Sequence, residues 1–165
     1  MKTRSRKLRL RSIFPVLPVV AALVGNSFAA AINKDTDGTD LTDTGSWVGD
    51  VVPGSGDVAT WVTGSLGGAS TIATAQSWQG IDVQSATTAI TTSGAGTLTL
   101  GTSGINIASG GVNLTLGMSR TFSASSNITV GAGRILTLNG GTGITTTFAD
   151  GTTTTLNGAG EVAIG

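Results

Sequence analysis

Three residue types that often carry chemistry are missing from this 165-residue chain: cysteine, histidine and tyrosine. Without them the chain has no disulfide bond, no Ser-His-Asp triad, no cysteine nucleophile and no zinc site with Cys or His ligands. Aromatic residues make up only 4% of the chain and charged residues 11%. Most familiar catalytic mechanisms are therefore excluded before any motif is considered.

Positive charge is scarce beyond the N-terminal segment. Six of the nine Lys and Arg residues lie within residues 1–11, whereas all nine acidic residues follow residue 34. Residues 30–165 therefore carry three positive and nine negative charges, a net charge of −6. This balance disfavours nucleic acid and anionic membrane surfaces as partners.

The N-terminus has the pattern of a signal peptide. Its basic residues precede an apolar run over 13–25, and small residues around Ala29 suit signal peptidase. The apolar run is well short of the roughly 20 residues that a membrane-spanning helix needs. We therefore expect a signal peptide over 1–29, no transmembrane segment in the mature chain, and export to the cell surface or the extracellular space, with the periplasm as an alternative.

Short runs with an apolar residue at every second position recur from residue 81 onward. Each run is bounded by Gly, Ser or Asn, and the runs cover 97–101, 105–108, 112–117, 127–131, 135–139 and 161–165. A period of two predicts strands whose side chains alternate between two faces. We expect one face to hold Leu98, Leu100, Leu114, Leu116, Ile128, Val130, Leu136, Leu138, Val162 and Ile164, and the other to hold Thr and Asn.

Related words in these strands recur after roughly 16 to 22 residues, the spacing that a coiled solenoid requires. An antiparallel sandwich would also give short alternating strands, but after Trp78 only Phe122 and Phe148 supply bulky aromatic side chains. Stacked coils can bury small aliphatic side chains against their neighbours without a disulfide bond. The sequence thus predicts an all-β parallel solenoid over 81–165.

The segment SWVGDVVPGSGDVATW, over 46–61, holds two of the three tryptophans. An uncapped solenoid end exposes unpaired strand backbone and an apolar cross-section, so a cap is expected before the repeats. Trp47, Trp61 and Trp78 are large enough to form it, and we place the cap over 46–80. The alternative is an open row of tryptophans that binds carbohydrate.

Together, this tryptophan segment and the Gly/Thr-rich words over 96–144 resemble exported bacterial proteins that carry autotransporter-associated β-strand repeats. The resemblance spans about 41–165. It implies a right-handed parallel β-helix of the passenger type, displayed or secreted, with a structural or adhesive role. It brings no catalytic residues with it.

The acidic stretch before the tryptophans, over 30–45, reads as a linker or an irregular first turn. It places four carboxylates within nine residues, which could gather around calcium: Asp35, Asp37, Asp40 and Asp43. The spacing fits neither an EF-hand nor the glycine-rich calcium nonapeptide. We therefore expect a solvated acidic linker and leave calcium as the alternative.

Enzymatic β-helices are the natural rival to a structural role. The charged residues of the repeat region are widely scattered: Asp82, Arg120, Arg134, Asp150 and Glu161. Sugar hydrolysis needs two carboxylates about 5 to 9.5 Å apart, and nothing in the sequence pairs them. We expect no enzyme, no catalytic residues and no cofactor, with Asp150 in a turn and both arginines facing solvent at bends.

The sequence therefore predicts an exported, non-enzymatic structural or adhesive β-solenoid at the cell surface. The partners that fit it are a surface polysaccharide or another solenoid. Two alternatives stay open: an extracellular polysaccharide-binding module, and a truncated passenger fragment without independent function.

Overall fold

The computed structural model of the protein describes residues 29–139 and 141–165. Apart from Ala29, the predicted signal peptide over 1–29 lies outside these residues. The described part is almost entirely β-structure, with one short 3₁₀ helix, η1 (Thr44–Ser46). Its strands are β1 Ala30–Asn33, β2 Asp57–Trp61, β3 Gly68–Thr71, β4 Gln76–Val83, β5 Ile90–Ser93, β6 Leu98–Ile107, β7 Leu114–Leu116, β8 Arg120–Phe122, β9 Ser126–Val130, β10 Ile135–Leu138, β11 Thr146–Phe148, β12 Thr154–Gly158 and β13 Glu161–Ile164.

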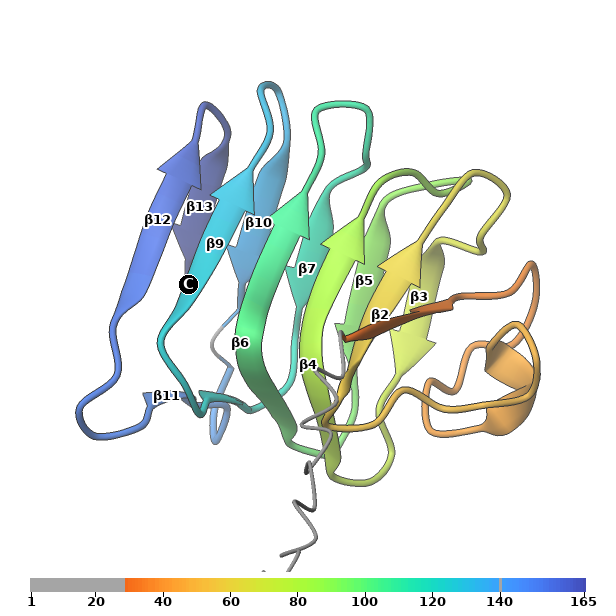
Figure 1. Cartoon of the computed structure of the whole chain (residues 1–165), viewed down its shortest axis with the longest axis horizontal. Helices are drawn as coiled ribbons and strands as arrows, with labels where there is room; N and C mark the ends of the chain where they lie inside the picture. Colours follow the sequence, from red (N-terminus) through yellow and green to blue (C-terminus); the bar gives the residue numbers. More distant parts are fainter. Residues whose placement is uncertain (1–28, 140) are drawn as a thin grey trace, which may run out of the picture.

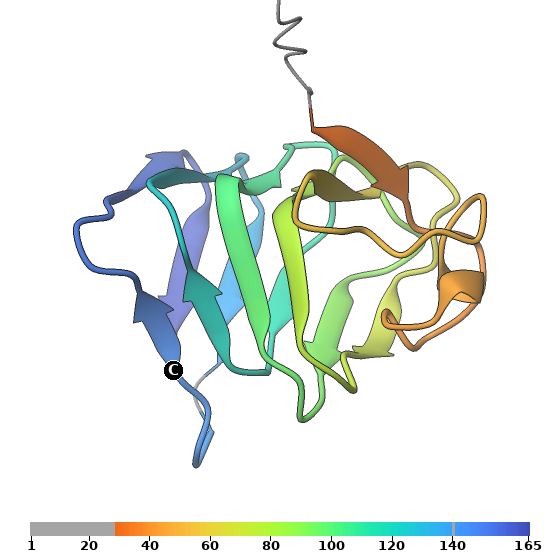
Figure 2. The ribbon, with the colours of Figure 1, turned by 60° about the horizontal axis from the view of Figure 1, so that its bottom comes forward.

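The strands form a parallel β-solenoid of about six turns. Figure 2 shows the turns stacked in chain order from the N-terminal to the C-terminal end. In Figure 1 the near strands β4, β6, β9 and β12 run upward, the far strands run downward, and the chain advances to the left. That combination makes the coil right-handed. The all-β parallel β-helix predicted from the sequence is confirmed.

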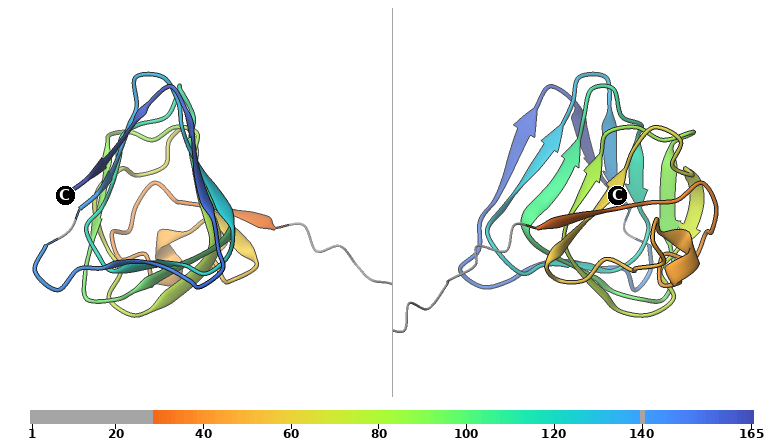
Figure 3. Two further views of the ribbon diagram at one scale, coloured as in Figure 1. Left: turned by 90° about the vertical axis from the view of Figure 1, so that its left-hand side faces the viewer. Right: turned by 45° about the vertical axis from the view of Figure 1, so that its right-hand side comes forward.

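The cross-section is a triangle, which Figure 3 (left) shows from the C-terminal end. One slanting side holds β2, β9, β12 and the second halves of β4 and β6. The other slanting side holds β3, β5, β7, β10 and β13, and the base holds β8, β11 and the first halves of β4 and β6. Each turn therefore adds one short strand segment to each side.

One turn takes at least 22 residues, more than the 16 to 22 expected from the recurring words. Gln76 pairs with Leu98, and Leu98 pairs with Arg120, so that both steps are 22 residues long. The next step on this side, from Arg120 to Thr146, takes 26 residues. The words recur more often than the turns because each turn contains more than one strand, and neighbouring strands share the same sequence pattern.

The core consists of columns of side chains from matching positions in successive turns. One column holds Trp61, Val83, Ile107 and Val130. A second holds Trp78, Leu100, Phe122 and Phe148. The third slanting side adds Ile90, Leu114, Leu136 and Val162. Each fully buried aliphatic side chain contributes about 1.5–3 kcal/mol, so modest residues suffice once they are stacked.

The alternation in the sequence correctly identified this core. Eight of the ten aliphatic residues expected on the inner face are buried. The other two belong to β13 in the last turn, where Val162 is half-buried and Ile164 is 75% exposed. They are less covered because no described turn follows theirs.

Two boundaries differ from the sequence prediction. Residues 30–45 are built into the fold: β1 pairs in parallel with β2, and both Lys34 and Leu41 are buried. The region 46–80 also contributes β2, β3 and β4 to the solenoid sheets, so the parallel coil begins well before residue 81. Thr and Gly dominate these strands, so they lack the Leu and Ile alternation that marked the later ones.

Candidate functional surfaces

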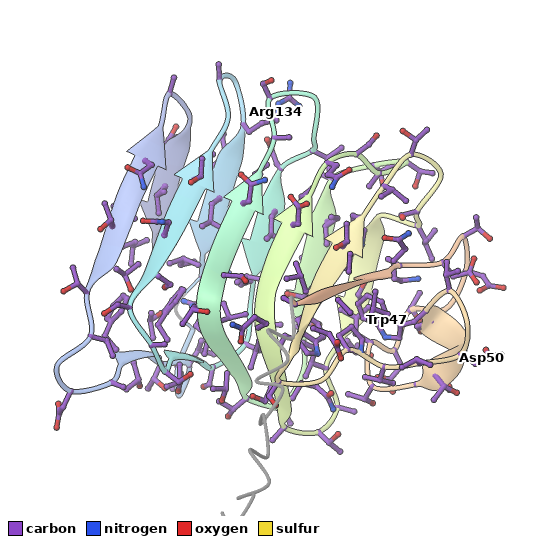
Figure 4. The ribbon with its side chains drawn as sticks, in the orientation of Figure 1. Trp47, Asp50 and Arg134 are labelled. Carbon is purple, nitrogen blue, oxygen red and sulfur yellow. The ribbon has the colours of Figure 1, made fainter. Side chains whose placement is uncertain are left out.

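The three tryptophans form one buried cluster at the N-terminal end of the solenoid. Trp47 lies edge-on to Trp61 and to Trp78, with ring centroids 5.7 Å apart in each pair and interplanar angles of 70° and 81°. Its indole Nε1 donates a hydrogen bond to the carbonyl of Leu41 at 3.1 Å. Figure 4 shows Trp47 inside the fold beneath the loop that carries Asp50. This edge-to-face geometry is the favourable one for aromatic pairs.

The cluster closes the aliphatic core. Trp61 and Trp78 each begin a core column, and Trp47 packs across both of them. All three side chains are at most 1% exposed, so they form a cap. The alternative of an exposed tryptophan row for carbohydrate is wrong, because no indole face is available to a sugar ring.

Lys34 is a buried charge beside this cap. Its Nζ donates hydrogen bonds to the backbone carbonyls of Asp35 and Asp37, and its backbone bridges to Trp47. Burial lowers the pKa of Lys34, while the charges of Asp35 and Asp37 partly oppose that shift. The lysine therefore fixes the first loop from the inside.

The acidic residues of that loop act mainly on their own backbone. Asp35 accepts from the amide of Thr36, and Asp40 accepts from the amide of Thr42. Asp43 caps η1 by accepting from the amide of Gly45 at 3.0 Å. These are the local turns that Asp favours.

The loop borders an open hollow that is lined in part by Asp37, Asp40 and Asp43. Within 29–139 and 141–165, no three acidic side chains lie close enough together to hold a metal ion. The four aspartates predicted as possible calcium ligands are thus dispersed along the loop, and the structure gives the calcium alternative no support.

The carboxylates of the repeat region are spread over different parts of the surface. Asp82 lies on β4 and accepts from Asn106 Nδ2 at 2.7 Å. Asp150 lies in the turn between β11 and β12, as predicted, and Glu161 begins β13. The structure brings no two of them together on one strand or turn, so they offer no obvious pair for glycoside chemistry.

Arg120 corrects a prediction from the sequence. It does not face solvent at a bend: it lies on β8, points into the core and is 1% exposed. Its guanidinium donates to the carbonyls of Leu116, Met118 and Asn139 and to Thr146 Oγ1. Burial lowers the pKa of Arg120. The side chain occupies the column position that Leu98 fills one turn earlier, so the strand pattern gave no sign of it.

Arg134 lies in the turn before β10 and is half-buried (Figure 4). Its Nε is shielded and has no hydrogen-bond partner among the described residues. It is therefore less exposed than the sequence predicted, although it does lie at a bend.

Columns of polar residues run along the outside of the solenoid. On the base, matching positions hold Ser77, Thr99, Thr121 and Thr147. On one slanting side they hold Thr91, Thr115 and Thr137. Amide side chains link neighbouring turns on the other, as between Asn157 and Asn127. These regular columns are the largest polar surfaces that the described residues present.

The C-terminal end is different, because its last turn is apolar and open. An apolar hollow of about 250 Å³ lies there between the three sides of the triangle. Its lining includes Phe148, Leu156 and Ile164, which are 50%, 59% and 75% exposed. This end is the main apolar surface of the described chain.

No protein-family model, curated protein or solved structure matches the chain. Within the part that the structure describes, no helix has the length and apolar character to cross a membrane.

Proposed function

We propose that the protein is exported and acts at the cell surface as a non-enzymatic structural or adhesive β-solenoid, as its resemblance to proteins with autotransporter-associated β-strand repeats implies. The observation that carries the proposal is the division of the molecule into a sealed apolar core and long outward columns of Thr and Asn. Such a body suits load-bearing and contact rather than chemistry at a cleft.

Rigidity follows from the way in which the turns are joined. Every turn is held to the next by parallel backbone ladders on three sides and by stacked core columns. Since each side chain in a column is covered by the next turn, bending the solenoid would expose apolar surface on one side. A stiff rod of this kind keeps its outer columns at fixed spacing.

Adhesion is supported by the outer columns themselves. The Thr hydroxyls and Asn amides repeat at the strand spacing of about 4.8 Å, so a periodic polymer can meet many weak polar contacts at once. The partner that suits this surface is a hydroxyl-rich surface polysaccharide. The buried tryptophans take no part in that binding.

The first test is location. Intact cells that produce the protein are treated with protease or labelled with antibody, and the mature N-terminus is read by mass spectrometry. We expect the protein to be accessible at the surface or released, with its N-terminus near residue 30. Retention in the cytoplasm with an intact leader would contradict the proposal.

The second test is attachment. Beads coated with the purified protein are compared with beads coated with a variant in which Thr91, Thr115 and Thr137 are replaced by Glu. The matched control carries Glu at Thr99, Thr121 and Thr147 on the base. Binding to immobilised polysaccharide or to cells should fall when the contacting column is changed. Equal, undiminished binding by both variants would contradict adhesion through these columns.

A further inference from the structure

The open C-terminal end exposes side chains that every earlier turn buries. Phe148 continues the column of Phe122 and stacks on it with ring centroids 5.2 Å apart. Leu156 continues the column of Ile128, and Ile164 that of Leu138. The earlier residues are at most 2% exposed because the next turn covers them. What fits on the last turn is therefore another β-coil of the same cross-section.

The edges of this turn are also free. Among the described residues, β11, β12 and β13 each pair with one strand only, β8, β9 and β10 respectively. An unpaired strand edge readily accepts another strand. A single added strand would cover one edge and leave the hollow open. The occupant must supply three edges arranged on the same triangle, which a second copy of this chain does by identity.

The N-terminal end cannot supply those edges. The tryptophan cluster fills the core there, and the loop over 34–57 lies across that end of the solenoid (Figure 3, right). Stacking head to tail would require that cap to be displaced. The remaining arrangement places two C-terminal ends face to face.

The outline of the last turn suits a two-fold arrangement. Seen from the C-terminal end, β12 and β13 form two sides that rise to a common apex above a base that holds β11 (Figure 3, left). A two-fold axis through the apex and the middle of the base exchanges the two sides. It brings β12, of five residues, beside the partner's β13, of four, and β11 beside the partner's β11. All of these pairs run antiparallel, which is the stable sense for added strands.

We propose that the last turn, β11 to β13, is the docking surface for a second copy of this chain, giving a closed dimer joined end to end. Phe148, Leu156 and Ile164 of both copies then fill one continuous core. The three strands carry a single charged residue, Glu161, so little charge is buried. Because the contact is isologous and the other ends are capped, association stops at two copies.

The oligomeric state is the first test, made by sedimentation equilibrium on the protein in the form that cells produce. We expect a monomer–dimer equilibrium with no larger species. Because each copy carries excess negative charge, raising the salt from about 0.05 to 0.5 M should strengthen association. A monomer at every concentration, or open-ended polymers, would overturn the proposal.

The arrangement is tested by a single cysteine, since the chain has none of its own. Thr147 points outward at the middle of β11, so Thr147→Cys lies beside its own copy across the two-fold axis. Mild oxidation should convert most of the protein to a disulfide-linked dimer. The matched control is Thr121→Cys, at the same column position one turn inward. Its two copies would lie roughly 14 Å apart, three strand spacings, which is too far for a disulfide bond.

A charge placed in the interface separates docking from other causes of association. Leu156→Asp should weaken dimerisation at least tenfold, whereas Val51→Asp, at a site that is 51% exposed near the opposite end, should leave it unchanged. Circular dichroism confirms that each variant is folded. Loss of the dimer in the Val51 variant, or its persistence in the Leu156 variant together with no Thr147 cross-link, would overturn the assignment.

Discussion

At the scale of single residues, the protein places its largest and most polar side chains at structural positions inside the solenoid. Trp47 closes the N-terminal end, Lys34 fixes the loop beside it, and Arg120 ties together carbonyls from two neighbouring turns. A buried charge is tolerated only where its donors are satisfied. These residues are therefore expected to govern stability.

Arg120→Ala should lower the free energy of unfolding by about 3 kcal/mol, because it leaves the carbonyls of Leu116 and Met118 without their buried donor. Arg134→Ala is the matched control. It should cost less than about 1 kcal/mol, since Arg134 is half-buried and its Nε has no partner among the described residues. Urea unfolding followed by tryptophan fluorescence measures both. Equal losses for the two variants would contradict the role assigned to Arg120.

Lys34 predicts a dependence of stability on alkaline pH. Its pKa is lowered in the folded protein, mainly by burial, from the ordinary value of 10.5. Between the folded pKa and 10.5 the unfolded chain therefore binds more protons at this site than the folded chain does. Stability contributed by this residue rises with pH across that window.

The test compares the free energy of unfolding of the wild type and of Lys34→Met from neutral pH to about 10.5. The difference between the two proteins should shift in favour of the wild type as the pH rises. A difference that stays constant, or shifts the other way, would show that Lys34 is not desolvated in the folded state.

At the scale of elements, the solenoid depends on glycines where a strand bends from one side of the triangle to the next. Gly104 lies inside β6 with a φ of +62°, and it pairs with Gly80 of the preceding turn. A Cβ at Gly104 would collide with the carbonyl oxygen of Asn127 in the following turn. Both the backbone conformation and the close approach of the turns require glycine here.

Gly104→Ala should therefore destabilise the protein by about 3 kcal/mol. Gly133→Ala serves as one control, because its φ is +71° but a Cβ would meet no atom within 4 Å. It should cost about 1 kcal/mol, the price of the conformation alone. Gly56→Ala, also in open space, should be nearly neutral. Thermal unfolding ranks the three, and any other order would contradict this account of the bend.

The later strands were the elements that the sequence predicted best. Leu and Ile alternate there in words such as LTLG, and the inward residues from Leu98 to Leu138 are buried as expected. β5, β11 and β12 went unrecognised because Thr dominates them, and Thr can face either side of a strand. Arg120 was misplaced because burial of a charge depends on carbonyls from distant turns, which no local pattern records.

At the scale of the whole molecule, the two ends of the solenoid differ in kind. The first is sealed by three tryptophans, and the last presents an open apolar hollow. The cap could be predicted from the tryptophan segment, since an aliphatic core needs large side chains to close it. The triangular outline and the 22-residue turn could not, because they depend on where the strands bend.

The central claim is that these tryptophans close a structural body and do not bind a ligand. The most direct test is the tryptophan emission of the folded protein, with acrylamide as quencher and soluble polysaccharides added. All three tryptophans are buried, so we predict blue-shifted emission that acrylamide quenches weakly and that polysaccharide leaves unchanged. Red-shifted emission that is readily quenched, and that shifts when a polysaccharide is added, would contradict the account.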